Sequence, residues 1–486
     1  MDFRQIKRQI REALKERNIP SLAVAVAKDG EFIWEDGFGW ANRETRLRSD
    51  PHIAYSLASI SKPITATALM TLVEKGQVDL DAPINEYLGD AKLVAHVGVA
   101  TGNQGGMDPK EAADKATVRH VANHTSGLPL HYQFFHADEP WRRPPRDLSI
   151  LRYGHLVRVP GERYVYANFG YGLLDYVIER ISRVPFGTYL KREVFDPLGM
   201  TRSSLGIGPN LAPYSAERYD LNGKPISFYD FDHPGASAVF CSAHDLIRFG
   251  LLHLKSLRID QRSILTPESI DEMQTPTTPS DPTDGYGIGW RIVSDNHGYR
   301  TVNHDGCMGG VRTRLMLVPD EDLAVAVLGN ASNGLPVEIT ESILSECLPG
   351  YVEAPAIKTD NDALDGDPPF SPHPALQGEW AGKIHTYSGN VSVQITIPER
   401  GPVLVRCGDG LHSILNDPTF VDDRLRGTAL GDIGTDDAAK RPYTLAFDLN
   451  LRLNVLNGSI SAVSKPGPKL GNALSHWCEL EKAPNH

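Results

Sequence analysis

The spacing of apolar residues at the N-terminus predicts a helix followed by a pair of strands. Within MDFRQIKRQIREALKERNIP, the apolar residues Phe3, Ile6, Ile10 and Leu14 recur at helical spacing. The next stretch, SLAVAVAKDGEFIWEDGFGWAN, holds two strand-like runs that meet at the Lys-Asp-Gly of residues 28–30. An Asp-Gly pair between apolar runs is a strong hairpin signal, so we expect two antiparallel strands here.

A second pair of strands is expected far along the chain from the first. The stretch TRLMLVPDEDLAVAVLGN has apolar runs on both sides of a turn at residues 319–322. The region between the two strand pairs is mostly helical and loop-like, and residues 171–182, YGLLDYVIERIS, have helical apolar spacing. We therefore expect an α+β fold, in which strands from both ends of this region form one antiparallel sheet with helices inserted between them.

The pattern changes after residue 352. Residues 353–374 are rich in Asp and Pro and lack periodicity, which is typical of a linker. Beyond them, apolar residues alternate with polar ones as they do in strands. Two such strand faces are expected, one with Val391, Val393, Ile395 and Ile397, and one with Leu445, Phe447, Leu449, Leu451 and Leu453. The sequence thus predicts a domain at 1–352, a linker at 353–374 and an antiparallel β-barrel or sandwich at 375–486.

Net charge and apolar runs narrow the range of partners. The chain has a formal net charge of −12, which disfavours a nucleic-acid backbone or an anionic membrane as its main partner. It holds no apolar run of the roughly 18 residues needed to span a membrane. The N-terminal stretch lacks the uninterrupted apolar segment of a signal peptide. We expect a cytoplasmic protein that binds neither nucleic acid nor membrane.

Cysteine and histidine spacing gives no metal or disulfide signature. The five cysteines are widely spaced, with no CxxC pair, and we expect free thiols at Cys241, Cys307, Cys347, Cys407 and Cys478. His120 and His124 are four residues apart, but Val121 stands where a metalloprotease helix needs glutamate. We expect no metal ion and no cofactor.

A candidate catalytic pair lies in YSLASISKPITATALM, residues 55–70. Ser59 is followed three residues later by Lys62, at the start of a run that looks helical. About one Ser-x-x-Lys is expected by chance in a chain of this length, so the motif alone decides nothing. Its ordinary interpretation is a helix start with a solvent-facing lysine.

Later stretches give this pair a context. RYVYANFGYGLL contains Tyr166 and Asn168, NHDGCMGGVRTRLMLVP contains His304, and ATVRHVANHTSGLP contains His124. Together with IPSLAVAV, PLGM and YGIGW, they make residues 5–345 or so resemble the β-lactamase-related serine hydrolases of the class C type. That family includes class C β-lactamases, D,D-carboxypeptidases, D-aminopeptidases and some esterases. The resemblance implies a serine β-lactamase and penicillin-binding-protein-like fold, with a sheet flanked by helices and a helical subdomain.

The resemblance implies catalytic roles for Ser59, Lys62 and Tyr166. A serine hydroxyl is a poor nucleophile until a base takes its proton. Lys62 lies one helical turn beyond Ser59, so its amine can reach the serine oxygen. Tyr166 would deprotonate Ser59 during acylation and later activate the water that releases the acyl group. Whether Lys62 or Tyr166 is the general base stays open.

The resemblance also implies substrate-binding roles for Asn168, His304, Gly306 and Cys307. The Asn168 amide would contact the substrate and, if its segment is extended, share a side with Tyr166. The backbone N–H groups of Ser59 and Cys307 would form the oxyanion hole, and Gly306 would permit a close approach. Structural interpretations stay open for Tyr166, Asn168 and His304, and an inert thiol is expected for Cys307.

His304 departs from the penicillin-recognising pattern, in which this position is usually lysine. A histidine is mostly neutral near pH 7, so strong recognition of a β-lactam or a C-terminal carboxylate is in doubt. It agrees better with D-aminopeptidase-like and esterase-like relatives. LQGEWAGKI and the alternation after it resemble the lipocalin-like barrels that some peptidases of this family carry.

We therefore expect a serine hydrolase that acts through an acyl-enzyme on small amides, short peptides or esters. We favour a peptidase-like or aminopeptidase-like activity on short peptides, and peptides that contain D-residues stay open as substrates. Three alternatives stay open: an esterase or acyltransferase with the same machinery, a β-lactamase, and a catalytically idle binding protein. A homo-oligomer also stays open.

Overall fold

The computed structural model describes residues 1–96, 108–277, 284–352, 370, 372–467 and 469–483. These residues form two compact units. The first consists of residues 1–82 and 136–141 with the described part of 170–358, and the second of residues 83–135 and 142–169 with the described part of 359–486. No helix in the described ranges is long and apolar enough to cross a membrane.

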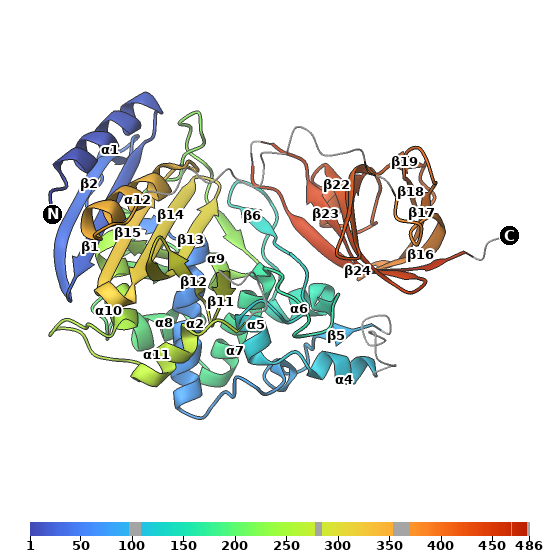
Figure 1. Cartoon of the computed structure of the whole chain (residues 1–486), viewed down its shortest axis with the longest axis horizontal. Coiled ribbons are helices and arrows are strands. Elements are labelled where there is room, and N and C mark those ends of the chain that lie inside the picture. Colours follow the sequence, from blue (N-terminus) through green and yellow to red (C-terminus); the bar gives the residue numbers. More distant parts are fainter. Residues whose placement is uncertain (97–107, 278–283, 353–369, 371, 468, 484–486) are drawn as a thin grey trace. The chain divides into compact units, whose positions relative to one another are not determined.

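The first unit is built on an eight-stranded sheet in the order β11-β12-β13-β14-β15-β1-β2-β3 (Figure 1). Its central pair joins the two ends of the unit, because β1 (Ser21–Lys28) pairs antiparallel with β15 (Leu323–Gly329). Both predicted hairpins are confirmed. Asp29 and Gly30 take positive φ angles of 53° and 76° between β1 and β2 (Glu31–Asn42), as a tight two-residue turn requires. The turn after β14 (Val311–Val318) uses Asp322 in the left-handed conformation.

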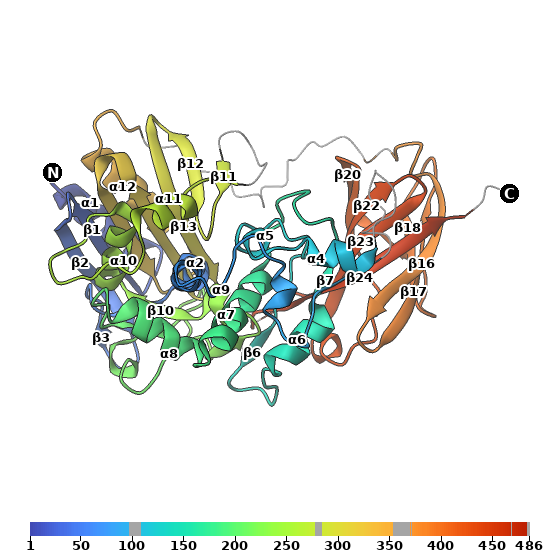
Figure 2. The same cartoon turned by 90° about the horizontal axis from the view of Figure 1, so that it is seen from below.

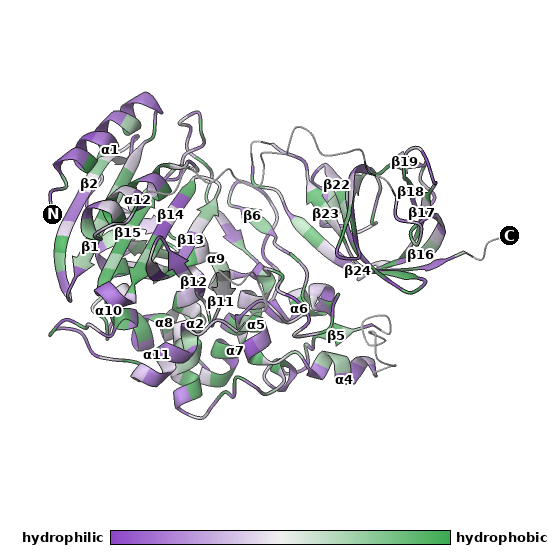
Figure 3. Cartoon of the chain, in the orientation of Figure 1, coloured by the Kyte–Doolittle hydropathy of each residue, from purple (hydrophilic) through white to green (hydrophobic). Residues whose placement is uncertain are grey.

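Side-chain size explains how helices cover both faces of this sheet. Alternate residues of the central pair are large and join one apolar cluster with α1 (Arg4–Glu16) and α12 (Leu335–Cys347); they include Leu22, Val24, Val26, Leu323, Val325 and Val327. The residues between them are alanines, and α10 (Ala243–Leu254) packs against this other face with Gly250 near Leu317 and Ala324. Small side chains on both elements let α10 approach closely. Figure 3 shows the same central strands as largely hydrophobic.

The remaining elements of the first unit surround its site. Three short strands form a second sheet in the order β4-β10-β8. The bounds are β3 Leu47–Arg48, β4 Ala54–Ser56, η1 Ala58–Ile60, α2 Ser61–Glu74, α8 Phe186–Leu190, η3 Lys191–Phe195, β8 Ser203–Leu205, η4 Ala212–Tyr214, β9 Tyr229–Phe231, α9 Pro234–Ser237, β10 Val239–Ser242, α11 Pro267–Met273, β11 Asp284–Tyr286, β12 Arg291–Asn296, β13 Tyr299–Met308 and η5 Pro319–Glu321. The helix α7 (Asn168–Ser182) begins in the second unit and continues in the first from Gly170.

The second unit combines short helices with a nine-stranded antiparallel sheet (Figure 2). Its shorter elements are η2 Ile84–Glu86, β5 Val94–Ala95, α4 Pro109–Asp114, α5 Val118–Ala122, β6 Phe134–His136 (whose last residue belongs to the first unit), α6 Arg146–Tyr153, β7 His155–Leu156 and η6 Ala438–Lys440. The strands are β16 Gly378–Thr386, β17 Gly389–Ile397, β18 Leu404–Cys407, β19 Ser413–Ile414, β20 Asn416–Val421, β21 Arg424–Ala429, β22 Tyr443–Arg452, β23 Val455–Ser464 and β24 Ala473–Lys482.

This sheet is a nearly closed barrel. Its two edge strands are β19 and β20, which are separated in the chain by Leu415 alone. The Ser413 hydroxyl helps to close the gap by donating a hydrogen bond of 2.7 Å to the carbonyl of Leu430, just after β21. The predicted α+β fold with an added antiparallel barrel is thus confirmed, whereas the specific likeness to lipocalins stays a prediction.

Alternation placed most of the barrel core correctly, although Val391 and Leu451 are only partly buried. Val393, Ile395 and Ile397 are buried on β17, and Leu445, Phe447 and Leu449 are buried on β22. Leu453, predicted to share that face, is instead 93% exposed. The reason is the turn between β22 and β23, in which Leu453 takes a left-handed φ of 55°.

The described residues of 83–135 and 142–169 pack against the barrel within the second unit. The backbones of Tyr132 and Ala473 form an isolated β-bridge. The buried Asp437 carboxylate accepts hydrogen bonds from the hydroxyls of Tyr153 and Tyr387. The compact units therefore group residues 83–135 and 142–169 with the barrel. The linker predicted at 353–374 lies mostly outside the described residues, and the boundaries at 352 and 375 stay a prediction.

Candidate active site

Ser59 lies in the short η1 turn immediately before α2. From Ile53 to Leu72, every residue except Ser59 is buried, so its side chain alone is partly open to solvent. Ala58, the residue before it, has a left-handed φ of 49°, which costs conformational energy in a residue with a Cβ atom. This strained turn presents a hydroxyl at the surface of an otherwise buried segment.

Lys62 is fully buried one turn along from Ser59. Its Nζ atom lies 3.2 Å from the Ser59 Oγ atom and 3.3 Å from the carbonyl oxygen of Ala236. The ring of Tyr171, in the part of α7 that belongs to the first unit, has its centre 5.7 Å from the same nitrogen. The structure thus excludes the solvent-facing lysine of the ordinary interpretation.

Burial decides the charge of this amine. Desolvation disfavours the ammonium form and lowers the pKa of Lys62 well below its ordinary value. A neutral amine can donate a hydrogen to the Ala236 carbonyl while its lone pair accepts the Ser59 proton. Lys62 is therefore able to act as a base toward Ser59.

The Ala236 carbonyl is fixed by contacts around the short helix α9. The backbone N–H of Gly235 donates to the Asp175 carboxylate at 2.6 Å, and the Gly235 carbonyl accepts from the Thr65 hydroxyl at 2.7 Å. A side chain at Gly235 would meet the Tyr171 carbonyl oxygen at 2.6 Å. These contacts hold one acceptor of the Lys62 amine in place.

His304 lies on β13 and is 7% exposed. Its Nδ1 atom is 2.8 Å from the Asp305 carbonyl oxygen, which only accepts, so Nδ1 carries the hydrogen. Nε2 then accepts from the Tyr286 hydroxyl at 3.0 Å. Burial is the largest cause that lowers the pKa of His304, to about 3, so the ring is neutral at physiological pH.

Gly306 lets β13 lie against the backbone that leads to Ser59. A Cβ atom at this position would stand 2.1 Å from the Leu57 carbonyl oxygen and 2.2 Å from the Thr313 hydroxyl oxygen. Thr313 donates to the same Leu57 carbonyl at 2.9 Å. The missing side chain at Gly306 therefore makes room for Leu57 and Thr313 of the same chain.

Cys307 follows on an open part of the sheet. The register of β12 against β13 ends at the pair Arg291 and Asn303, while β14 continues to Met308. Within the described residues, β13 from His304 onward thus has a strand neighbour on one side only. The Cys307 side chain is exposed.

Tyr166 and Asn168 belong to the second unit and are both partly exposed. Their segment is not a strand, because residues 163–167 are irregular and Asn168 is the first residue of α7. The expectation that an extended segment places the side chains of Tyr166 and Asn168 on the same side therefore does not apply. His124 holds the segment: its ring lies 4.4 Å from the Tyr166 ring, its carbonyl accepts from Val165, and its Nδ1 atom accepts from the Ala167 N–H at 3.2 Å.

Three residues described above had no role assigned from the sequence: Ala236 and Tyr286 of the first unit, and His124 of the second. Tyr286 and His124 lie within YGIGW and HTSGLP, motifs that mark the resemblance, so their positions could be found although their contacts could not. The backbone carbonyl of Ala236 leaves no signal in the sequence, because any residue supplies one. The side chains of Thr117 and His120 form the capping box at the start of α5. The described residues contain no group of three or more His, Cys, Asp or Glu side chains able to hold a metal ion.

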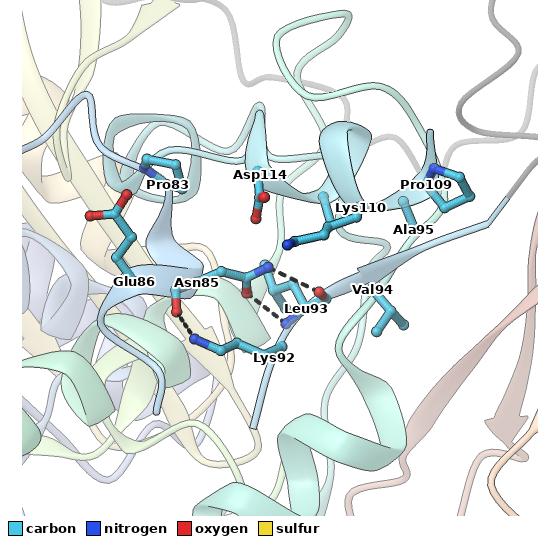
Figure 4. A pocket seen from close by; sticks show the side chains of 11 residues that line it. Pro83, Asn85, Glu86, Lys92, Leu93, Val94, Ala95, Pro109, Lys110 and Asp114 are labelled. Atoms are coloured by element: carbon cyan, nitrogen blue, oxygen red, sulfur yellow. Dashed lines mark hydrogen bonds between the residues drawn. The ribbon is translucent and has the colours of Figure 1, made fainter. Parts of the chain in front are cut away.

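A separate pocket of about 560 Å³ lies in the second unit (Figure 4). The Asn85 side chain bonds both backbone groups of Leu93, and the Lys92 amine donates to the Asn85 carbonyl. Lys110 and Asp114 lie on the opposite wall. None of the predicted site residues lines this pocket.

A family model described as "Beta-lactamase" matches residues 6–344. Protein flp of Staphylococcus aureus strain N315 is 23% identical over 345 residues, which are 70% of this chain and 65% of that protein. The match thus spans slightly less than two thirds of that relative's length. The putative penicillin-binding protein PbpX of Bacillus subtilis is 27% identical over 298 residues, 60% of this chain and 67% of that protein.

Three solved structures share the fold. The octameric penicillin-binding protein homologue from Pyrococcus abyssi has a TM-score of 0.61 and 23% identity, over 99% of this chain and 100% of its own. SurE, in a crystal structure with D-Leu, has a TM-score of 0.61 and 21% identity, over 99% of both chains. EstCE1, a hydrolase with promiscuous acyltransferase activity, has a TM-score of 0.57 and 18% identity, over 70% of this chain and 97% of its own. The matching family model covers more than half of the chain, and the protein therefore belongs to the beta-lactamase family of serine hydrolases.

Proposed function

We propose that the protein hydrolyses small amides, short peptides or esters through an acyl-enzyme on Ser59. The contact of 3.2 Å between Lys62 Nζ and the partly exposed Ser59 hydroxyl carries this proposal. A buried neutral amine beside an accessible hydroxyl is the arrangement that makes serine nucleophilic.

The proposed reaction has two steps. The Ser59 oxygen attacks the substrate carbonyl carbon while its proton passes to the base. The protonated base then gives this proton to the leaving group, which departs. Water then attacks the ester carbon, and Ser59 regains its proton as the acid product leaves. We assign Lys62 and Tyr166 to these proton transfers, with Lys62 supported as the first base by its lowered pKa.

The substrate carbonyl needs donors for its developing negative charge. We assign this role to the backbone N–H groups of Ser59 and Cys307, and substrate contact to Asn168. The packing of Gly306 against Leu57 supports a joint role for these two N–H groups, because it brings β13 next to the segment that carries Ser59. The open side of β13 supports an extended substrate that adds to the strand.

The neutral state of His304 supports a substrate without a carboxylate at that point. We therefore favour amides and peptides over β-lactams, with a peptidase-like activity on D-residues as the leading case. The D-Leu in the SurE structure supports this choice as an analogy from that protein. An esterase or acyltransferase activity is the second candidate, because EstCE1 combines hydrolase and acyltransferase activities in the same fold.

A fluorophosphonate probe and a substrate panel test the proposal. The chain should be labelled at Ser59 and should turn over some of a panel of L- and D-aminoacyl amides, short-chain esters and nitrocefin, with nitrocefin slow or inert. Ser59→Ala should lose both labelling and turnover. Ser61→Ala removes a neighbouring hydroxyl that accepts from Val239, and should keep both. Failure to label under several conditions would favour the idle binding protein.

We also propose a cytoplasmic location and leave the oligomeric state to measurement. The Pyrococcus homologue is octameric, which supports a test for a homo-oligomer in this chain. Light scattering coupled to size exclusion distinguishes a 53.4 kDa monomer from any assembly.

A further inference from the structure

Residues 157–167, the Tyr166 segment, form neither helix nor strand and depend on contacts with other parts of the second unit. The backbone N–H of Val157 donates to the Gly127 carbonyl at 2.8 Å. Further along, His124 accepts from the backbone on either side of Tyr166, and its ring lies against the Tyr166 ring. This first set of contacts involves no residue of the barrel.

The barrel supplies a second set of contacts, which includes an ion pair with a buried arginine. Arg158 of the segment is 3% exposed, and its Nη2 atom lies 3.1 Å from the Oδ2 atom of Asp448 on β22. Arg424 of β21 fixes the same carboxylate, because its Nε atom donates to Oδ1 at 3.0 Å. A buried guanidinium needs such a counter-ion, because it has lost the water that would otherwise stabilise its charge.

Arg158 has no substitute for Asp448 in the described part of the chain. Its Nε and Nη1 atoms are buried there without a hydrogen-bond partner. Burial lowers the pKa of the guanidinium, and attraction to the Asp448 carboxylate is the largest opposing influence. Arg424 and Arg163 lie near enough to repel it. Removal of the carboxylate would leave a buried cation near other cations, so the chain around Arg158 would have to move.

Further contacts, polar and apolar, join the Tyr166 segment to the barrel. Arg452, at the end of β22, donates from Nη2 to both carboxylate oxygens of Glu162, at 2.8 and 2.7 Å. Val157 and Trp477 of β24 are buried together in one apolar cluster. Both contacts are made by residues that precede Tyr166 by fewer than ten positions, so the barrel determines how the chain reaches this tyrosine.

We propose that the barrel holds Tyr166 in place by bracing the segment that leads to it, with Asp448 and Arg452 as positioning residues. This inference rests on the proposed function, which assigns proton transfers to Tyr166. A group that transfers protons must stay within hydrogen-bond reach of its partner, and a small displacement lowers the rate strongly. Both positioning residues act through the Tyr166 segment and not by contact with the substrate.

Hydrogen exchange followed by mass spectrometry tests the brace independently of activity. In the full chain carrying Asp448→Asn, the peptide that spans residues 157–167 should exchange about tenfold faster than in the native chain, because its amides lose protection when Arg158 moves. Asp432→Asn makes the same chemical change elsewhere in the barrel, where Asp432 accepts from the Tyr443 hydroxyl at 2.6 Å, and should leave this peptide unchanged. Native exchange in β16 and β17 shows that each variant is folded.

Charge reversal at the second ion pair keeps the test decisive if Asp448→Asn does not fold. Glu162 and Arg452 are both partly exposed, so changes at these positions are tolerated by the fold. Glu162→Arg and Arg452→Glu should each speed exchange of the same peptide about twofold, because an exposed ion pair contributes little. The two changes together restore an ion pair and should restore native exchange. Native exchange of this peptide in a folded Asp448→Asn variant, or in both single reversals, would overturn the proposal.

Kinetic measurements connect the brace to Tyr166. Asp448→Asn should lower kcat about tenfold with little change in KM, and the same substitution in a Tyr166→Phe background should lower kcat no further. An equal loss in both backgrounds would show that Asp448 does not act through Tyr166 and would overturn the positioning role. If the native chain turns over no substrate, the proposed function fails, and hydrogen exchange alone decides whether the barrel holds the Tyr166 segment.

Discussion

The Nζ atom of Lys62 lies 3.2 Å from the Oγ atom of Ser59, and these two residues differ sharply in exposure. The serine is partly open to solvent, whereas the lysine is fully buried. A substrate can therefore reach the hydroxyl without rehydrating the amine that activates it. Exclusion of water from the base lowers its pKa and so favours the neutral form, which can accept a proton.

Lys62→Met should abolish activity and stabilise the fold. Loss of the base should lower kcat/KM by about a thousandfold, while removal of a buried ionisable group should raise the free energy of unfolding at pH 7 by about 1–2 kcal/mol. Because the folded-state pKa lies below the unfolded value, the unfolded chain binds an extra proton between the two. The stability of the native protein should then rise with pH toward 10.5, and the gap to the variant should narrow.

Thermal unfolding of both proteins between pH 7 and 10 measures this effect. Lys75→Met, at the exposed end of α2, is the matched control and should change neither activity nor the pH dependence of stability. A Lys62→Met variant less stable than the native protein at every pH would show that the hydrogen bonds of the amine outweigh its desolvation.

Gly306→Ala should impair the site through packing. The new Cβ atom would overlap the Leu57 carbonyl oxygen, so β13 and the segment before Ser59 must separate. We expect a loss of about 1–3 kcal/mol in unfolding free energy, together with a fall in kcat. Gly208→Ala meets no atom within 4 Å and serves as the control in chemical denaturation and kinetics. Native kinetics in Gly306→Ala would remove this contact from the mechanism.

His304 should govern acid stability and leave the pH–rate profile near neutrality unchanged. Its folded-state pKa is about 3, below the ordinary 6.5, so the unfolded chain alone binds a proton between these values and stability falls as pH drops through this range. His304→Gln should retain up to about 4 kcal/mol of that stability near pH 3. The His304 ring also contributes no inflection to kcat/KM between pH 5 and 8.

His253→Gln is the control variant that separates an effect on acid stability from an effect on activity, in unfolding and kinetic measurements. The pKa of His253 is also lowered to about 3 by burial, and its ring contacts Thr67 in the core of the same unit. This variant should share the gain in acid stability with native activity. A kinetic inflection near pH 6 that disappears in His304→Gln would contradict a permanently neutral ring.

Asp437→Ala should loosen the packing of the barrel on residues 142–169. Burial alone would raise the pKa of this carboxyl, but hydrogen bonds from Tyr153 and Tyr387 bring it below its ordinary value. Its removal leaves buried hydroxyls unpaired and should cost about 2–3 kcal/mol. The neighbouring Asp436 is exposed, so Asp436→Ala should unfold like the native protein in denaturant. Equal stability of the two variants would contradict this account.

Local signals predicted the elements of the fold well. Asp29-Gly30 specified a hairpin because that dipeptide accepts the positive φ angles of a tight turn, and Val393 and Ile395 revealed a strand face by alternation. The motif at Ser59 and Lys62 located the candidate site because helical spacing fixes the reach of one side chain to the other. These features depend on neighbours within a few residues.

Contacts between distant residues could not be predicted from such patterns. The grouping of residues 83–135 and 142–169 with the barrel depends on pairs such as Tyr153 and Asp437, which are far apart in the chain. The lowered pKa of His304 arises from burial, which a sequence does not state. Leu453 was misplaced because the turn that exposes it lacks the glycine that usually marks a left-handed position.

The bridge between Tyr132 and Ala473 has an evolutionary consequence. Without the C-terminal barrel, the backbone groups of Tyr132 that pair with Ala473 and the buried hydroxyl of Tyr153 would lose their partners and would need water in their place. Gain or loss of the barrel gene segment should therefore be accompanied by substitutions within residues 130–158, hundreds of codons away.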